Sequence, residues 1–294
     1  MKRTTFGDKV FTVFCYVFCV LLFVVTLYPF IYTLSGSFSG NIALTRGDVW
    51  LFPVDPTLEA YKAVFSDASI WTAYGNTIWY VVVGTVIGLI LTILTAYPLS
   101  RRTFAGRRPI SLILSFTMFF SGGIIPLYLL VQQLGLLDTR WSIVLPGAVS
   151  VWNVILMRTF FQSLPEELIE AATIDGCSEF RILLQIVLPL SMSIIAVIIL
   201  YIAVAQWNGF FSALIYLRDA TKYPLQLKLR EVLIQYDTRN MENNPGAALI
   251  DQQKQIGISI RHATIIVSIL PIICVYPFLQ KYFVKGVMVG AIKG

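Results

Sequence analysis

Long apolar runs separated by short polar segments dominate this chain of 294 residues. A helix needs about 20 mainly apolar residues to cross the hydrocarbon core of a bilayer. Runs of that length cover residues 11–34, 74–99, 110–134, 141–161, 189–211 and 262–283. Gly122, Gly123 and Pro126 interrupt the third run, so we expect a bend there. The pattern predicts an all-α integral membrane protein with six transmembrane helices in one domain, residues 1–294.

Composition supports a membrane protein and excludes an ordinary soluble domain. Hydrophobic residues make up 57% of the chain, charged residues only 13%, and the mean hydropathy is +0.76. The net charge is +6, but the basic residues lie beside apolar runs and not on one surface, so we do not expect nucleic acid as a partner. The four cysteines and the single histidine show no metal-binding spacing, and we expect no metal.

The placement of basic residues predicts the orientation. The N-terminal segment, the arginine loop at residues 101–108 and the C-terminal segment are basic and alternate with the other loops. Short basic loops stay in the cytoplasm. We therefore expect both termini, the arginine loop and the segment 163–188 to be cytoplasmic. The long polar segment of about residues 212–261 should then lie outside.

The segment 163–188 is polar and acidic at its start. We expect Ser163 to cap a helix there, with Glu166 completing a capping box. On a helical wheel one face is apolar, with Leu164, Leu168, Ala171 and Ala172, and the opposite face is acidic, with Glu166, Glu167 and Glu170. Gly176 should end this helix and Ser178 should begin a second one. Taken alone, such a pattern is most often an interfacial helix or a solvated loop.

The spacing of this segment adds a family resemblance. Glu170-Ala171-Ala172, three residues, Gly176, nine residues and Ile186-x-Leu188-Pro189 resemble the EAA loop of ABC-importer permeases. FPVDPTLEAYKAVF, IPLYLLVQQLGLLDTRWSIVLP, YPLQLKLREVL and the final GAIKG resemble the matching parts of carbohydrate-importer permeases. The likeness is to the MalG-like type, and within it to the LplC/YtcP-like and alginate-importer subunits. It implies the type I ABC importer permease fold. The segment 212–261 is longer than in the maltose-type subunits.

The resemblance also implies partners and roles. The partners would be a second permease subunit in a heterodimer, an ATPase dimer and an extracytoplasmic solute-binding protein, in the bacterial cytoplasmic (inner) membrane. The residues that would couple to the ATPase are Glu166, Glu167, Glu170, Ala171, Ala172, Asp175 and Gly176. The tail 284–294 would reach the ATPase through Gly286, Gly290, Lys293 and Gly294. The chain has no G-x-x-x-x-G-K-[ST] loop, so we expect no enzyme activity and no bound cofactor, with ATP and Mg²⁺ used by the partner ATPase.

Amide and aromatic residues inside the apolar runs are the candidates for a substrate path. They are Trp152, Asn153, Gln206, Trp207 and Asn208. Such side chains suit sugars, although hydrogen bonding between helices explains each one at least as well.

The family resemblance favours import of an oligosaccharide, such as an alginate or pectin fragment, by ATP-driven alternating access. The alternatives are the same machine with a peptide or polyol, a secondary transporter, or a structural membrane protein. A secondary transporter would favour intramembrane ionisable residues, which are nearly absent here.

Overall fold

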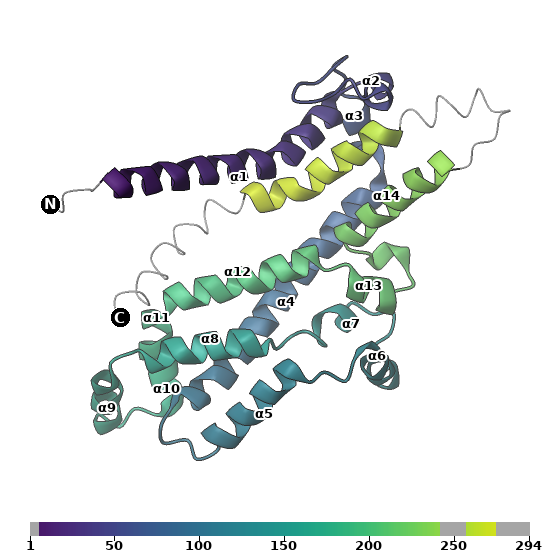
Figure 1. Ribbon diagram of the computed structural model, residues 1–294. Helices are drawn as coiled ribbons and strands as arrows, with labels where there is room; N and C mark the ends of the chain where they lie inside the picture. The colour runs from purple at the N-terminus through teal and green to yellow at the C-terminus, as the bar shows by residue number, and fades with distance from the viewer. Residues whose placement is uncertain (1–5, 242–256, 275–294) are drawn as a thin grey trace. The chain divides into compact units, whose positions relative to one another are not determined.

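The computed structural model describes residues 6–241 and 257–274, and the described part contains helices and loops without a strand (Figure 1). The chain divides into two compact units. Unit 1 comprises residues 1–68 and 229–270, and unit 2 comprises residues 69–228 and 271–294.

Unit 1 contains the first and last of the predicted spans. Its helices are α1 (Phe6–Phe38), α2 (Asn41–Arg46), α3 (Glu59–Ser66) and the helix Gly257–Cys274 as far as Leu270. The first run is helical as predicted, and the last begins five residues before the predicted residue 262; its predicted end lies outside the described residues. The His262 ring packs edge-on against Tyr32 at 5.6 Å and covers Gly36, so it has a structural role.

Unit 2 begins with α4 (Ala68–Ser100), which confirms the second predicted span. Its later helices are α5 (Arg107–Phe119), α6 (Ile124–Gln133), α7 (Trp141–Val144), α8 (Val151–Gln162), α9 (Glu166–Ile174), α10 (Glu179–Ile182), α11 (Leu188–Leu190), α12 (Met192–Asn208) and α13 (Phe211–Tyr216). A π-helical turn, Leu183–Val187, joins α10 to α11. A 3-10 turn at Ala220–Lys222 precedes α14 (Leu225–Met241), which begins in the predicted YPLQLKLREVL segment. From Leu229 on, α14 belongs to unit 1.

Three predicted spans are not single helices. The run 110–134 breaks between α5 and α6 with an angle of 114°, at Gly123 with φ +83°. The run 141–161 forms α7 and the twelve-residue α8, separated by a segment that contains Pro146 and Gly147. The run 189–211 bends by 84° after α11. Among the described residues, three helices are long and apolar enough to cross a membrane, or up to five if each bent pair is one span. The bend predicted at Gly122, Gly123 and Pro126 is therefore confirmed, whereas hydropathy alone did not reveal the other two breaks. The all-α membrane fold agrees with the prediction, and the number of six spans stays a prediction.

Two glycines on α4 allow close packing inside unit 2. A Cβ at Gly84 would lie 2.8 Å from Gln206 Nε2, and one at Gly88 would lie 3.0 Å from the Ala148 carbonyl oxygen and 3.2 Å from Ile202 Cδ1. Gln206 and Ile202 belong to α12. The spacing of four residues is the small-residue pattern that lets membrane helices approach. We did not predict this contact from the sequence.

A polar cluster ties the start of α4 to the loops after α6 and α13. Asn76 is 3% exposed. Its amide nitrogen donates to the carbonyl oxygens of Thr221 (2.7 Å) and Tyr223 (3.1 Å), and its oxygen accepts from Arg140 (2.9 Å). The Arg140 guanidinium also lies 5.3 Å from the centre of the Trp79 ring. We call this group the Asn76 cluster.

The carboxylate of Asp138 extends the Asn76 cluster. Backbone N–H groups of Asp219 and Arg218 donate to Asp138 Oδ1, both at 3.1 Å, and Lys222 Nζ lies 3.4 Å from its other oxygen. These donors lower the pKa of Asp138, with the backbone hydrogen bonds as the larger cause. These contacts hold the loop after α6 against the loop after α13.

Candidate functional site

The acidic segment forms the helix α9, but not with the predicted cap. Pro165 occupies the N-cap position and provides no side-chain hydrogen bond. Ser163 instead ends α8, where its hydroxyl donates to the Phe160 carbonyl oxygen at 2.7 Å. The predicted capping box with Glu166 is therefore wrong, because the serine is already used by the preceding helix.

Two apolar residues anchor α9 in the core of unit 2. Ile169 and Ala172 are 7% and 6% exposed and pack in a cluster with Tyr97 from α4, Met157 from α8 and Ile198 from α12. Burying an isoleucine side chain contributes about 1.5–3 kcal/mol. The helix is thus fixed to the membrane helices behind it and cannot be a detached loop.

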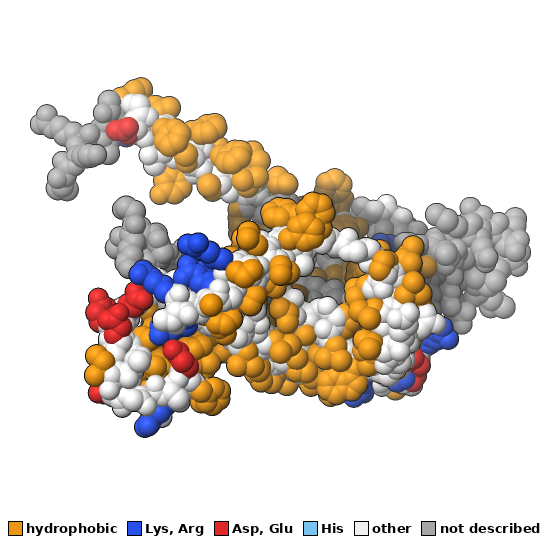
Figure 2. Space-filling view, turned by 90° about the horizontal axis from the view of Figure 1, so that it is seen from below, with side chains coloured by type: hydrophobic (Ala, Val, Ile, Leu, Met, Phe, Trp, Pro, Cys, Tyr) orange, Lys and Arg blue, Asp and Glu red, His pale blue; other side chains and the backbone are white. Residues whose placement is uncertain are grey.

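The opposite face of α9 is exposed and carries both apolar and acidic side chains. Leu168 is 46% and Ile174 is 86% exposed. Figure 2 shows the acidic side chains gathered at the α9 end of unit 2, with basic side chains beside them. The wheel prediction was partly wrong, because Leu168 and Ala171 lie on the exposed side while Ile169 and Ala172 form the buried one. The carboxylates of Glu167, Glu170 and Asp175 are exposed and make no ion pair within the described part of the chain.

Gly176 ends α9 as predicted. Its φ is +77°, in the left-handed region, and its N–H donates to the Thr173 carbonyl oxygen while the Cys177 N–H donates to that of Ala172. These two bonds form a Schellman motif. Ser178 then caps α10 by accepting from the Arg181 N–H at 3.4 Å. Gly176 therefore sets the angle at which α10 leaves α9.

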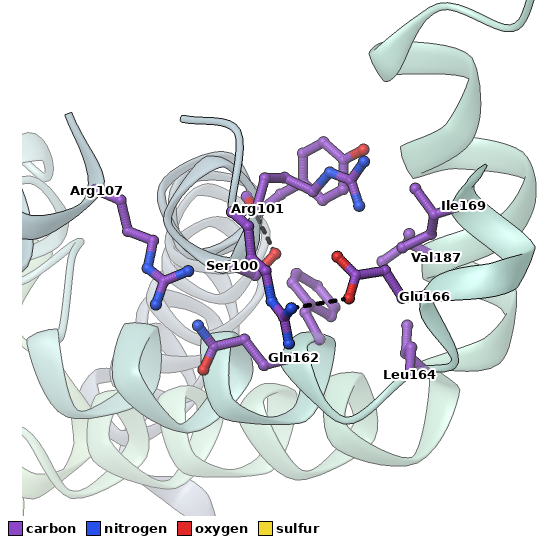
Figure 3. Close-up of a pocket in the computed structure, with 11 residues that line it drawn as sticks. Ser100, Arg101, Arg107, Gln162, Leu164, Glu166, Ile169 and Val187 are labelled. Carbon is purple, nitrogen blue, oxygen red and sulfur yellow. Dashed lines mark hydrogen bonds and ion pairs between the residues drawn. The ribbon is translucent and has the colours of Figure 1, made fainter. Parts of the chain in front are cut away.

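The arginine loop supports this segment through two carboxylates. Arg102 NH1 lies 3.4 Å from Glu166 Oε2, and Arg101 Nε lies 3.6 Å from Glu179 Oε2. The Tyr97 hydroxyl donates to the same Glu179 oxygen. Figure 3 shows Arg101, Arg107, Gln162 and Glu166 around the cleft between these elements. Glu166, predicted to meet the ATPase, is paired within the chain, and the roles of Tyr97 and Glu179 were not predicted from the sequence.

The five candidates for a substrate path lie at one end of the α8–α12 pair, because these neighbouring helices run in opposite directions (Figure 1). Trp152 is 57% exposed and Asn153 is 5% exposed. Gln206 covers Gly84, while the Trp207 ring packs edge-on against Tyr74 at 6.3 Å. Asn208 is exposed at the end of α12. Gln206 and Trp207 thus have packing contacts, and a substrate role for the five stays a prediction.

Other predictions fall outside the described residues. The tail with Gly286, Gly290, Lys293 and Gly294 lies there, as does part of the segment 212–261.

The fold and the site define a class of protein: a multi-pass helical membrane protein that presents a short acidic and apolar helix on a rigid base at one end of its membrane helices. Comparison with known proteins gives the family. Residues 84–289 match the family described as "Binding-protein-dependent transport system inner membrane component", and the chain belongs to it.

Individual relatives agree with the family. The chain is 43% identical to the protein LplC of Bacillus subtilis over 94% of each chain. It is 37% identical to the polygalacturonan/rhamnogalacturonan transport system permease protein YtcP of the same organism, over 98% of this chain and 99% of YtcP. A chain of a solved bacterial ABC transporter involved in the import of the acidic polysaccharide alginate is similar with a TM-score of 0.87 and 37% identity, over 96% of this chain and all of that one.

Proposed function

We propose that this chain is the permease subunit of a binding-protein-dependent ABC importer for oligosaccharides, and that α9 is its docking helix for the ATPase. The single observation that carries the docking role is the construction of α9. One face is fixed in the core by Ile169 and Ala172, and the other exposes Leu168, Glu170 and Ile174. Family membership supports the transport role.

The exposed face has the chemistry of a protein interface. A side chain as large as Ile174, 86% exposed at the last turn of a helix, gains free energy when a partner buries it. The unpaired carboxylates around it would meet basic groups of the partner and fix the orientation. We further propose that this end of unit 2 faces the cytoplasm, which the basic residues of the neighbouring arginine loop support.

Changing the exposed face should detach the ATPase without disturbing the permease. We expect Ile174→Asp to reduce copurification of the ATPase about tenfold or more, because it removes an apolar contact and adds a charge to be desolvated. Glu170→Ala should have a smaller effect of the same direction. The measurement is the amount of ATPase recovered with the affinity-tagged permease pair.

Glu179 offers a control, because its carboxylate already interacts with Tyr97 and Arg101 of this chain. Glu179→Gln keeps the size of that side chain, and we expect it to retain most of the ATPase. Full recovery of the ATPase with Ile174→Asp would contradict docking at α9. In intact cells, a cysteine at position 174 should resist an impermeant thiol reagent, and labelling from outside would contradict the proposed orientation.

The substrate class follows from the relatives. YtcP transports polygalacturonan and rhamnogalacturonan by its name, and the similar solved transporter is involved in import of alginate. These three polysaccharides are acidic, so we propose that this importer takes uronate oligomers. We expect the partner binding protein to bind oligogalacturonate or oligoalginate more tightly than neutral oligomers of equal length in calorimetry. Binding of neutral oligomers alone would contradict this substrate class.

A further inference from the structure

The arginine loop contributes to a polar cleft at the α9 end of unit 2 (Figure 3). The cleft has a volume of about 230 Å³. Its polar wall is made by Tyr97, Ser100, Arg101, Arg102, Arg107, Gln162 and Glu166. Three guanidinium groups and the carboxylate of Glu166 thus line the cleft, and the carboxylate of Glu179 lies 3.6 Å from Arg101.

Two of these arginines have capacity for an anion. Arg101 makes only a loose ion pair, because its buried Nε lies 3.6 Å from Glu179 Oε2, beyond hydrogen-bonding distance. The rest of its guanidinium lines the cleft, where an anion can reach it. Arg107 makes no ion pair within the described ranges. Behind them, Arg158 of α8 donates to Ser111 of α5 at 3.1 Å and adds a further positive charge. Guanidinium groups suit phosphate because they can donate two parallel hydrogen bonds.

An apolar groove lies next to the cleft, on the other side of Arg101 and Tyr97. It has a volume of about 410 Å³ and shares Tyr97 and Arg101 with the polar cleft. Its other walls are Leu94, Pro98, Thr103, Phe104, Glu179, Phe180 and Leu183. A basic cleft and an apolar groove thus meet at two side chains, Tyr97 and Arg101.

The groove continues along α4 as an exposed apolar stripe. Val82, Val86, Ile90 and Leu94 follow each other at four-residue spacing, and each is between 49% and 55% exposed. At 1.5 Å per residue the stripe extends for about 18 Å. This is the length scale of one fatty acyl chain in half of a bilayer core of about 30 Å.

We propose that this site binds an anionic phospholipid of the leaflet at the α9 end. The phosphate lies in the arginine cleft, held by Arg101 and Arg107, and one acyl chain lies in the groove against Phe104 and Leu94. The charge of the cleft selects an anionic over a zwitterionic headgroup. The apolar groove selects a lipid over free phosphate, which could fill only the cleft.

The test uses the assembled complex, with its second permease and ATPase, in nanodiscs of phosphatidylglycerol and phosphatidylcholine. The measurement is the ratio of the two lipids that remain bound after detergent extraction, determined by native mass spectrometry. We expect Arg101→Gln/Arg107→Gln to lower the preference for phosphatidylglycerol about 10- to 30-fold, as expected for two juxtamembrane basic residues.

Matched variants distinguish this lipid site from diffuse surface charge and from a simple anion site. Arg108→Gln removes the same charge from the same loop but lines neither cavity, so it should change the preference less than twofold. Phe180→Asp should reduce retention of long-chain phosphatidylglycerol, and millimolar inorganic phosphate should not displace the lipid.

Three results would overturn the proposal. Equal losses with Arg108→Gln would indicate diffuse surface attraction, and displacement by phosphate would indicate a simple anion site. An unchanged lipid preference of the assembled complex with Arg101→Gln/Arg107→Gln would show that the cleft does not select the anionic headgroup.

Discussion

Gly176→Val, directly after α9, should uncouple the importer more than any single change within that helix. Valine at φ +77° costs about 1–2 kcal/mol or more, because its Cβ collides with the following carbonyl group and its β-branching adds strain. No heavy atom lies within 4 Å of the Cβ position at Gly176, so the cost comes from the backbone and not from crowding. The chain can relieve this strain only by changing the Schellman motif, which would alter the angle between α9 and α10.

The expected result is a complex that assembles but shows about a tenfold or greater loss of binding-protein-stimulated ATP hydrolysis and sugar uptake. Gly176→Asn should retain more activity than Gly176→Val, because asparagine tolerates the left-handed region better. The measurement is hydrolysis and uptake by the reconstituted complex, normalised to the amount of bound ATPase.

Gly47→Val provides the control for backbone strain alone. Gly47 has φ +78°, ends the helix α2 and has no heavy atom within 4 Å of its Cβ position, which matches Gly176 closely. We expect Gly47→Val to cost similar stability yet keep binding-protein-stimulated hydrolysis and sugar uptake well above those of Gly176→Val. Equal behaviour of the two variants in these assays would show that the turn at Gly176 has no special part in coupling.

The sequence predicted the local parts of this site because their causes are local. Gly176 needs positive φ at the end of a short helix, and Ser178 is a preferred N-cap residue directly before α10. Both effects depend on a few neighbouring residues. The prediction for Ser163 was wrong because local rules allow a serine both at the start of α9 and at the end of α8. In the structure Ser163 ends α8, where its hydroxyl donates to the Phe160 carbonyl oxygen.

The supporting contacts could not be predicted in the same way. The pairs Arg102–Glu166 and Tyr97–Glu179 join residues 64 and 82 positions apart, and nothing in either segment specifies the other. Hydropathy located the apolar runs, and the glycines and proline at residues 122–126 predicted the break between α5 and α6. The break after α11 was not predicted, because a kinked span and a straight one have the same apolar length. The four-residue spacing of Gly84 and Gly88 was a readable signal for close helix packing that we did not use.

Asn76→Leu should destabilise unit 2 strongly, through a polar cluster that the sequence did not reveal at all. The substitution keeps the size of the side chain and removes three hydrogen bonds. The carbonyl groups of Thr221 and Tyr223 then lose their donor, and the Arg140 guanidinium loses its acceptor. A lost bond to a charged group costs about 1.5–3 kcal/mol and each unsatisfied buried group about 1–3 kcal/mol, so a destabilisation of about 3–5 kcal/mol is expected.

Thermal unfolding of the purified complex, followed by tryptophan fluorescence, should show this loss as a clearly lower midpoint for Asn76→Leu. Asn208→Leu, at an exposed amide at the end of α12, should change the midpoint little.

Asn76→Asp is a sharper variant: its carboxylate can still accept from Arg140, but it can no longer donate to the two carbonyl oxygens and repels them. We expect it to unfold above Asn76→Leu and below the parent, since one of the three contacts survives. If Asn76→Leu and Asn208→Leu unfolded at the same temperature, the Asn76 cluster would not stabilise the loops after α6 and α13. The apolar contacts of α13 would then be what holds these loops in place.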